Sequence, residues 1–107
     1  MLGGFSGGRF ASTRAMPEPA LKRTVTVANR EGLHARPAVL IVAEARKFAA
    51  RVVIAKGLHE VEATDVLQLM TLGAAQGEQL SLEGTGSEAQ AAVDAIEQLF
   101  LRKFDED

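Results

Sequence analysis

A histidine and an arginine stand two positions apart in the stretch GLHARPA, residues 32–38. A neutral imidazole is a nucleophile near neutral pH, and a guanidinium holds phosphate oxygens with a rigid fork of N–H donors. If His34 attacked a phosphoryl donor, Arg36 could bind the oxygens of the transferred group. The residue types and their spacing therefore favour phosphoryl chemistry at His34.

The same stretch lies where an apolar helix must begin. The first turn of a helix has backbone N–H groups without partners, and the helix dipole adds partial positive charge, so phosphate suits this place. Pro37 pre-sets the helical φ in that turn, and Gly32 lets the preceding loop turn sharply. The residues by themselves favour an anion-binding position and no more, because a lone histidine near a helix start is usually a cap or a surface residue.

The spacing of apolar residues predicts three helices. The first runs from about Ala35 to Phe48, with inward positions Ala38, Ile41, Val42, Ala45 and Phe48. A short second helix follows Asp65, which we expect to cap it with Gln68 as capping-box partner, and it ends at Gly73. The last helix spans about 88–103 after a second capping box, Ser87 with Gln90, and buries Ala89, Ala92, Val93, Ile96, Leu99 and Phe100.

Four short segments have the alternation or the β-branched composition of strands. They are TVTVAN (24–29), RVVIA (51–55), HEVEA (59–63) and QLSLE (79–83). With the helices, the order is β-α-β-β-α-β-α. This order predicts an α+β domain, an open-faced β-sandwich in which a four-stranded antiparallel sheet carries three helices on one face.

Composition limits the class of protein. The chain has 107 residues, enough for one small domain, and its formal net charge of -2 argues against nucleic acid as a partner. The absence of cysteine excludes disulfides and thiolate zinc sites, and the two histidines lie on different predicted elements, so we expect no metal site. His59 is interpreted as a surface residue. No window of ~18 uninterrupted apolar residues occurs, so we expect no membrane span.

The first 21 residues differ from the rest. They contain Gly3, Gly4, Gly7 and Gly8, and no acidic residue precedes Glu18. We expect residues 1–21 to form a disordered extension and residues 22–107 to form the domain. Two other interpretations stay open, an organelle transit peptide and a translation start at Met16. At the other end, the acidic residues 105–107 are expected to be solvated.

GLHARPA and the order of elements after it resemble the histidine-containing phosphocarrier proteins, the HPr family, of the bacterial phosphotransferase system. The resemblance covers about residues 22–103, and the segment 64–86 resembles the family's second helix, glycine exit and fourth strand. It implies that His34 is phosphorylated at Nδ1 by an enzyme I charged from phosphoenolpyruvate, and that it passes the group to an enzyme IIA. Arg36 matches the family's phosphate-binding arginine, and the backbone amides of Ala35 and Arg36 would face the phosphate.

The resemblance also implies partners and a setting. It implies a cytoplasmic monomer that is a carrier and not a free-standing turnover enzyme, with enzyme I, enzyme IIA and other regulatory proteins as partners. No cofactor is implied, and magnesium would be needed only by enzyme I. No nucleic acid or membrane partner is implied. The expected partner-docking residues on the first two helices are Ala35, Val39, Leu40, Val66, Leu67, Leu69 and Met70.

Two positions depart from the family pattern. Many relatives have a regulatory serine where this chain has Asp65, which either caps the helix or imitates phosphoserine with a permanent negative charge. Glu31 would repel the phosphate if it leaned over the site, and would do little if it pointed to solvent. The ending FDED and the long last helix favour the nitrogen-regulating branch of the family over sugar transport.

A second hypothesis comes from another class of protein. A small regulatory binding module with this fold could act through protein–protein contacts without phosphorelay, because the fold alone does not decide function. His34 together with Arg36 separates the two hypotheses, since a pure binding module does not need the imidazole. A free-standing hydrolase is disfavoured, because the chain has no second base, no nucleotide-binding Gly-x-x-x-x-Gly-Lys loop and no metal cluster.

Overall fold

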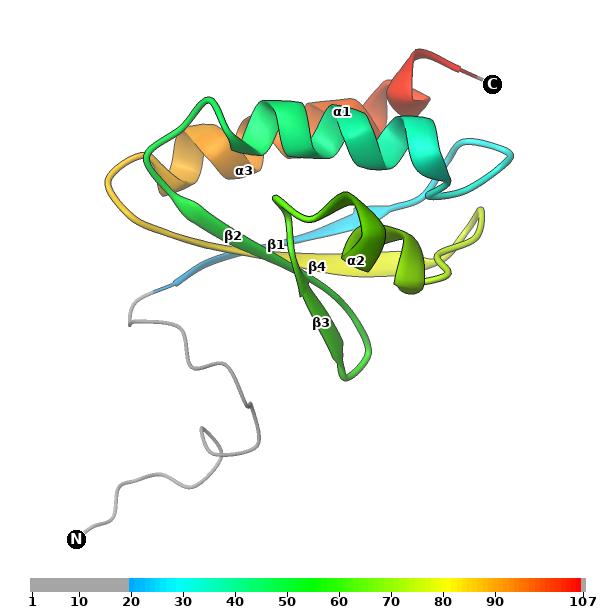
Figure 1. Ribbon diagram of the computed structural model, residues 1–107, viewed down its shortest axis with the longest axis horizontal. Helices are drawn as coiled ribbons and strands as arrows, with labels where there is room; N and C mark the ends of the chain where they lie inside the picture. Colours follow the sequence, from blue (N-terminus) through cyan, green and yellow to red (C-terminus); the bar gives the residue numbers. More distant parts are fainter. Residues whose placement is uncertain (1–19, 107) are drawn as a thin grey trace, which may run out of the picture.

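The computed structural model of this protein describes residues 20–106. Its strands form one antiparallel sheet in the order β1-β4-β2-β3, and its three helices cover one face of that sheet (Figure 1). This arrangement confirms the predicted α+β fold. The elements are β1 (Leu21–Thr26), α1 (Ala35–Ala45), β2 (Arg51–Lys56), β3 (His59–Glu62), α2 (Val66–Thr71), β4 (Gln79–Thr85), α3 (Ala89–Leu101) and the 3₁₀ turn η3 (Lys103–Asp105).

The boundaries of the domain differ slightly from those expected. Leu21 already pairs with Gly84 in β1, so the sheet begins one residue before the predicted start of the domain. The rest of the predicted extension, residues 1–19, lies outside the described part of the chain, as does Asp107. Within residues 20–106, no helix is long and apolar enough to cross a membrane.

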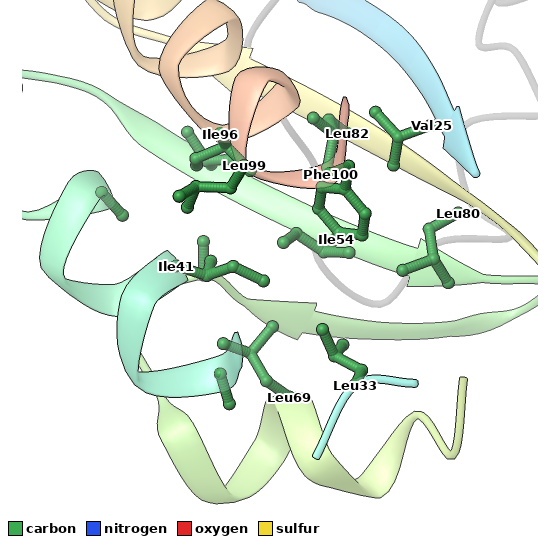
Figure 2. Packing of buried hydrophobic residues seen from close by; sticks show 14 of the residues in the cluster. Val25, Leu33, Ile41, Ile54, Leu69, Leu80, Leu82, Ile96, Leu99 and Phe100 are labelled. Atoms are coloured by element: carbon green, nitrogen blue, oxygen red, sulfur yellow. The ribbon is translucent and has the colours of Figure 1, made fainter. Parts of the chain in front are cut away.

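The core lies between the sheet and the helices, because alternate strand residues point to that face. Ile54 pairs with Leu82 across β2 and β4, and Val25 pairs with Leu80 across β1 and β4, so these side chains stack in register. Figure 2 shows Ile41 of α1, Ile96 and Phe100 of α3 and Leu69 of α2 converging on them. The inward positions Ala38, Ile41, Val42, Ala45, Ala92, Val93, Ile96, Leu99 and Phe100 are confirmed as buried.

The first helix is shorter than its apolar pattern suggests. α1 ends at Ala45, and Phe48 is half-buried. The amides of Lys47 and Phe48 bond carbonyls three residues back, those of Glu44 and Ala45, in place of the four-residue spacing of an α-helix. This tighter turn ends the helix and leads the chain toward β2.

The predicted capping box at the last helix is wrong. The N-cap of α3 is Glu88, which makes no side-chain cap bond. Its carboxylate accepts a hydrogen bond from the amide of Ala49 at 2.6 Å, and its own amide bonds the Ala49 carbonyl at 3.1 Å. The loop before α3 is therefore joined to the loop after α1, and this contact prevails over the local Ser87–Gln90 signal.

Candidate functional site

His34 is the N-cap residue of α1. Its backbone is extended, with φ -86° and ψ -165°, and its side chain makes no capping hydrogen bond. The backbone carbonyl accepts from the amide of Ala38 at 3.1 Å, which begins the helix. Because the half-buried ring takes no part in capping the helix, it remains available for chemistry at the helix start.

The loop before His34 is fixed against the end of α2. The amide of Leu33 bonds the carbonyl of Ala74 at 2.9 Å, and the Leu33 side chain is buried. Gly32 has φ +72°, and a Cβ at this position would lie 2.4 Å from the Ala74 oxygen. The glycine is therefore required twice, by its backbone conformation and by the close approach of a second loop.

The first turn of α1 offers two backbone amides to an anion, those of Ala35 and Arg36. Pro37, the third residue of the helix, has no N–H, and the amide of Ala38 is already bonded. Within residues 20–106, neither the Ala35 nor the Arg36 amide has a hydrogen-bond acceptor, and both residues are exposed. These two amides therefore lie together beside His34 with their hydrogen-bonding capacity unused by residues 20–106.

The Arg36 side chain bends toward the end of the chain and contacts acceptors there. Nη1 donates to the carbonyl oxygen of Phe104 at 3.2 Å and to Oε2 of Glu106 at 3.4 Å. A carboxylate therefore already lies against the guanidinium. Arg36 and Glu106 thus form an ion pair beside the His34 ring.

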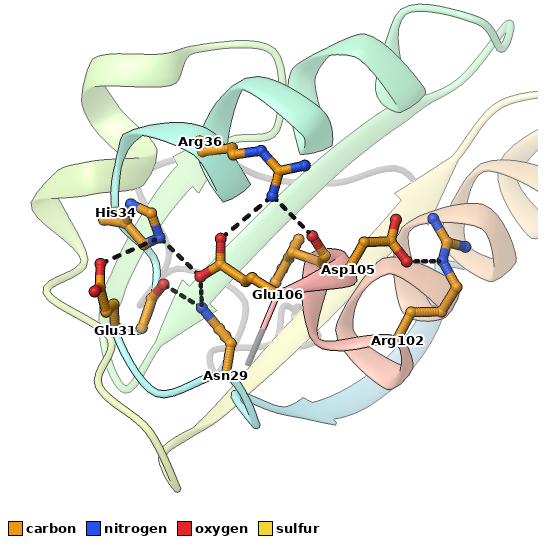
Figure 3. Close-up of polar contacts among 9 residues, drawn as sticks. Asn29, Glu31, His34, Arg36, Arg102, Asp105 and Glu106 are labelled. Carbon is orange, nitrogen blue, oxygen red and sulfur yellow. Dashed lines mark hydrogen bonds and ion pairs between the residues drawn. The ribbon is translucent and has the colours of Figure 1, made fainter.

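The prediction that the acidic ending is solvated is wrong for Glu106. Oε1 of Glu106 lies 2.9 Å from Nε2 of His34 and accepts from Nδ2 of Asn29 at 3.0 Å, as Figure 3 shows. Its side chain is only 21% exposed. The neighbouring Asp105 is exposed and pairs with Arg102, in agreement with the prediction.

A buried aromatic ring explains why the ending turns back. Phe104 is fully buried and packs edge-to-face on Phe100, with ring centroids 4.9 Å apart. Burying this ring directs the following residues over the start of α1 instead of into solvent. The charge of the ending suggested solvation, but the burial of one phenylalanine decides its path.

The His34 hydrogen bond is the largest influence on the Glu106 carboxyl and lowers its pKa below the ordinary value of 4.5. Hydrogen bonds from Asn29 and Arg36 lower this pKa further, while partial desolvation opposes them. Glu106 is therefore ionised at neutral pH. An ionised carboxylate only accepts hydrogen bonds, so the shared proton belongs to Nε2 of the imidazole.

Glu31 also lies near the imidazole, though more loosely. Its Oε1 is 3.9 Å from Nε2 of His34, and its side chain is 74% exposed. Both Glu31 and Glu106 therefore face Nε2. In the described part of the chain, Nδ1 of His34 has no hydrogen-bond partner. The two acidic residues lie on the side of the ring opposite to the nitrogen that the family resemblance assigns to phosphorylation.

Asn29 is a site residue that the sequence did not reveal. It is fully buried, and its Nδ2 donates to the carbonyl of Gly32 at 2.7 Å as well as to Glu106. Its Oδ1 is buried without a partner among residues 20–106. The sequence places Asn29 at the end of the predicted strand 24–29, whereas β1 ends at Thr26 and leaves Asn29 in the loop, where an asparagine is typical of a turn.

The predicted docking residues fall into three groups, which are exposed, half-buried and fully buried. Val39, Leu67 and Met70 are 52%, 74% and 40% exposed. Ala35 is also exposed, while Leu40 and Val66 are half-buried. Leu69 is wrong as a docking residue, because it points from α2 into the core and is fully buried.

Two remaining residues behave as surface positions. Asp65 caps α2, since its Oδ1 accepts from the amide of Gln68 at 3.0 Å, and the capping interpretation is confirmed. The reciprocal half of the capping box is absent, because the Asp65 amide bonds Glu62 instead. His59 is exposed, with Nε2 3.1 Å from Oγ1 of Thr71, as the surface interpretation predicts.

Comparisons with known proteins cover nearly all of the folded region. A family model described as "PTS HPr component phosphorylation site" matches residues 21–101. Phosphocarrier protein HPr of Treponema pallidum is 40% identical over 85 residues, 79% of this chain and 97% of that protein. Phosphocarrier protein NPr of Shewanella violacea is 42% identical over 86 residues, 80% of this chain and 94% of that protein. The crystal structure of HPr-C-His from Thermoanaerobacter tengcongensis has a TM-score of 0.77 and 34% identity, with 81% of this chain and 98% of that chain covered.

Proposed function

The chain belongs to the HPr family of phosphocarrier proteins of the phosphotransferase system, and we propose that His34 is the residue that carries its phosphoryl group. One observation carries this assignment. The imidazole stands at an uncapped helix start with Nδ1 unpartnered among the described residues, beside the amides of Ala35 and Arg36. A nucleophile and donors for an anion therefore meet at one place.

The proposed transfer needs only groups that this site contains. Nδ1 of His34 attacks phosphorus and forms an N–P bond, while the bond from phosphorus to the donor side chain breaks and its electron pair stays with the donor. The amides of Ala35 and Arg36 and the guanidinium of Arg36 bind the phosphoryl oxygens. Passing the group onward is the same displacement, with an acceptor side chain as the nucleophile.

The donor in this proposal is an enzyme I charged from phosphoenolpyruvate, and the acceptor is an enzyme IIA. Magnesium is needed by enzyme I, and this chain uses no cofactor of its own. One half-buried ring must be presented to two partners in turn, which suits a cytoplasmic monomer. Other regulatory proteins could bind the same surface.

The proposed docking surface consists of exposed apolar residues on two neighbouring helices. Val39 of α1 and Leu67 and Met70 of α2 supply its most exposed side chains. Ala35 continues it to His34, with Leu40 and Val66 at its half-buried base. Exposed apolar side chains that gather beside a reactive residue favour contact with a protein partner.

Intact-mass measurement tests the proposed function. The purified protein is mixed with enzyme I, magnesium and phosphoenolpyruvate, beside His34→Ala and, as a matched control, His59→Ala. We expect one acid-labile phosphoryl group on the wild type and on His59→Ala, and none on His34→Ala. If several enzymes I, including one of the nitrogen branch, leave the wild type unmodified, the protein is instead a regulatory binding module.

A further inference from the structure

We propose that Glu106 is a positioning residue for His34, which holds the Nε2–H of the imidazole and so keeps the lone pair on Nδ1. The proposal rests on the proposed function of His34 as phosphoryl acceptor. Glu106 lies beyond residues 21–101, the region that the family model matches. Its assignment therefore comes from the contacts of this chain and not from the family match.

The contacts fix the Glu106 carboxylate from three directions. Oε1 lies 2.9 Å from Nε2 of His34 and 3.0 Å from Nδ2 of Asn29, and Oε2 lies 3.4 Å from Nη1 of Arg36. Asn29 is itself immobilised, because it is fully buried and bonds the carbonyl of Gly32 at 2.7 Å. The same asparagine thus links the carboxylate to the loop that carries the histidine.

The direction of the Glu106–His34 hydrogen bond decides the tautomer of the ring. The lowered pKa of Glu106 keeps its carboxylate ionised at neutral pH, so it can only accept. Nε2 must then be the protonated nitrogen in the neutral ring, and Nδ1 has the free electron pair. A carboxylate that orients an imidazole in this way is a known means of activating histidine.

The backbone that delivers Glu106 is strained. Lys103, Phe104 and Asp105 all have left-handed backbones, with φ of +56°, +54° and +59°, although none is glycine. Residues other than glycine rarely adopt this conformation, and three in a row need strong support. The buried Phe104 ring holds one end of the turn, and the Glu106 contacts hold the other. Strain retained in this way is typical of functional segments.

The charge balance of the transfer gives Glu106 a second task. When Nδ1 forms the N–P bond, Nε2 keeps its proton and the ring gains one positive charge. The electron pair of the broken donor bond leaves with the side chain of enzyme I. The ionised Glu106, at 2.9 Å, balances the new positive charge on the ring, so no proton has to leave during the step.

Two measurements on the full chain test the inference. The first records the ¹⁵N chemical shifts of the His34 ring, which report the tautomer without any partner protein. The second records the rate at which enzyme I phosphorylates the protein at neutral pH. The variants are Glu106→Ala and Glu106→Gln, with Asp105→Asn as control, because Asp105 is adjacent, exposed and paired with Arg102.

We expect Glu106→Ala to be phosphorylated roughly tenfold more slowly, the effect of losing one partly exposed hydrogen bond to a charged group. Its ring should become a mixture of tautomers. Glu106→Gln keeps an acceptor oxygen but no charge, so it should retain the Nε2–H tautomer and recover part of the rate. Asp105→Asn should match the wild type in both measurements.

An unchanged tautomer and rate in Glu106→Ala would overturn the inference, as would equal slowing in Asp105→Asn. If Glu106→Ala does not fold, Glu106→Gln decides, because loss of the Nε2–H tautomer without slowing would overturn the positioning role, and a rate equal to that of the wild type would overturn the role of the charge. A wild type that enzyme I cannot phosphorylate would instead overturn the proposed function of His34. That failure is distinct, because the tautomer is measured without enzyme I.

Discussion

The helices α1 and α2 begin in opposite ways. At α2 the N-cap is Asp65, whose carboxylate accepts from the amide of Gln68, the third residue of the helix. At α1 the N-cap is His34, which makes no cap bond, and the third residue is Pro37, which has no amide to offer. The α2 start satisfies one of its amides with a side chain, whereas the first two amides of α1 have no acceptor among residues 20–106.

This difference shows that an uncapped helix start loses stability and gains unpartnered backbone amides. A good N-cap is worth about 1 kcal/mol of stability, which α1 forgoes. In return, the amides of Ala35 and Arg36 stay without an acceptor beside the His34 ring, within residues 20–106. The lack of a side-chain cap alone does not leave a helix start open. The start of α3 also lacks such a cap, but there Glu88 joins the helix start to Ala49 of a neighbouring loop. Among the helices of residues 20–106, only α1 combines unpartnered amides with an imidazole and a guanidinium.

The largest expected effect comes from a substitution in the loop before α1, which packs against the loop at Ala74. Gly32→Ala should lower the free energy of unfolding by about 3 kcal/mol, through a left-handed backbone and overlap with the Ala74 carbonyl. Gly57→Ala is the control, because φ is +60° there but nothing lies within 4 Å of the added methyl, so about 1 kcal/mol is expected. Urea unfolding measures both. Equal losses would mean that the Ala74 loop yields to the methyl group.

The next effect separates docking at α2 from chemistry at α1. If α2 is a docking surface, Leu67→Glu should weaken the apparent affinity for enzyme I by roughly tenfold, with little change in the rate at saturation. Leu101→Glu on α3 makes the same substitution at another exposed leucine and should change neither quantity. Steady-state phosphorylation at several concentrations of the protein measures both quantities. Equal weakening by the two variants would argue against a docking site on α2.

The smallest effect concerns the closed helix start. Asp65→Ala removes the cap of α2 and should cost about 1 kcal/mol in denaturant unfolding, while the phosphorylation rate of His34 stays unchanged. Asp65→Asn keeps a capping oxygen and should retain most of the stability. A drop in phosphorylation rate in both variants would instead show that the negative charge of Asp65 acts on partner binding.

The sequence predicts those features of the fold and of the site that are determined by residues close together in the chain. Alternation and helical spacing locate the strands and helices, because each element must present an apolar face to one core. His34, Arg36 and the α1 start are readable for the same reason, since they lie within a few residues of one another. Leu69 is an exception, because its expected docking role comes from the family resemblance, whereas the structure buries its side chain on the inward face of α2.

The other half of the site depends on contacts between distant segments. Glu106 meets His34 across 72 positions, and Asn29 meets Glu106 across 77. No local pattern encodes these pairs. They depend on the burial of Phe104, which the acidic residues around it in the sequence do not predict. The competition at Ser87 is similar, because a short-range capping signal gave way to a contact with Ala49 that becomes visible only once the chain is folded.

The distance along the chain between His34 and Glu106 also determines how long after His34 its acidic partner is synthesised. At roughly 5–20 residues per second, a ribosome adds the 72 residues between them in roughly 4 to 14 seconds. Throughout that time the growing chain contains GLHARPA without its acidic partner, and β1 still lacks β4. The motif is thus synthesised early and the complete site late. A nascent chain therefore contains His34 well before Glu106 is present to bind its ring.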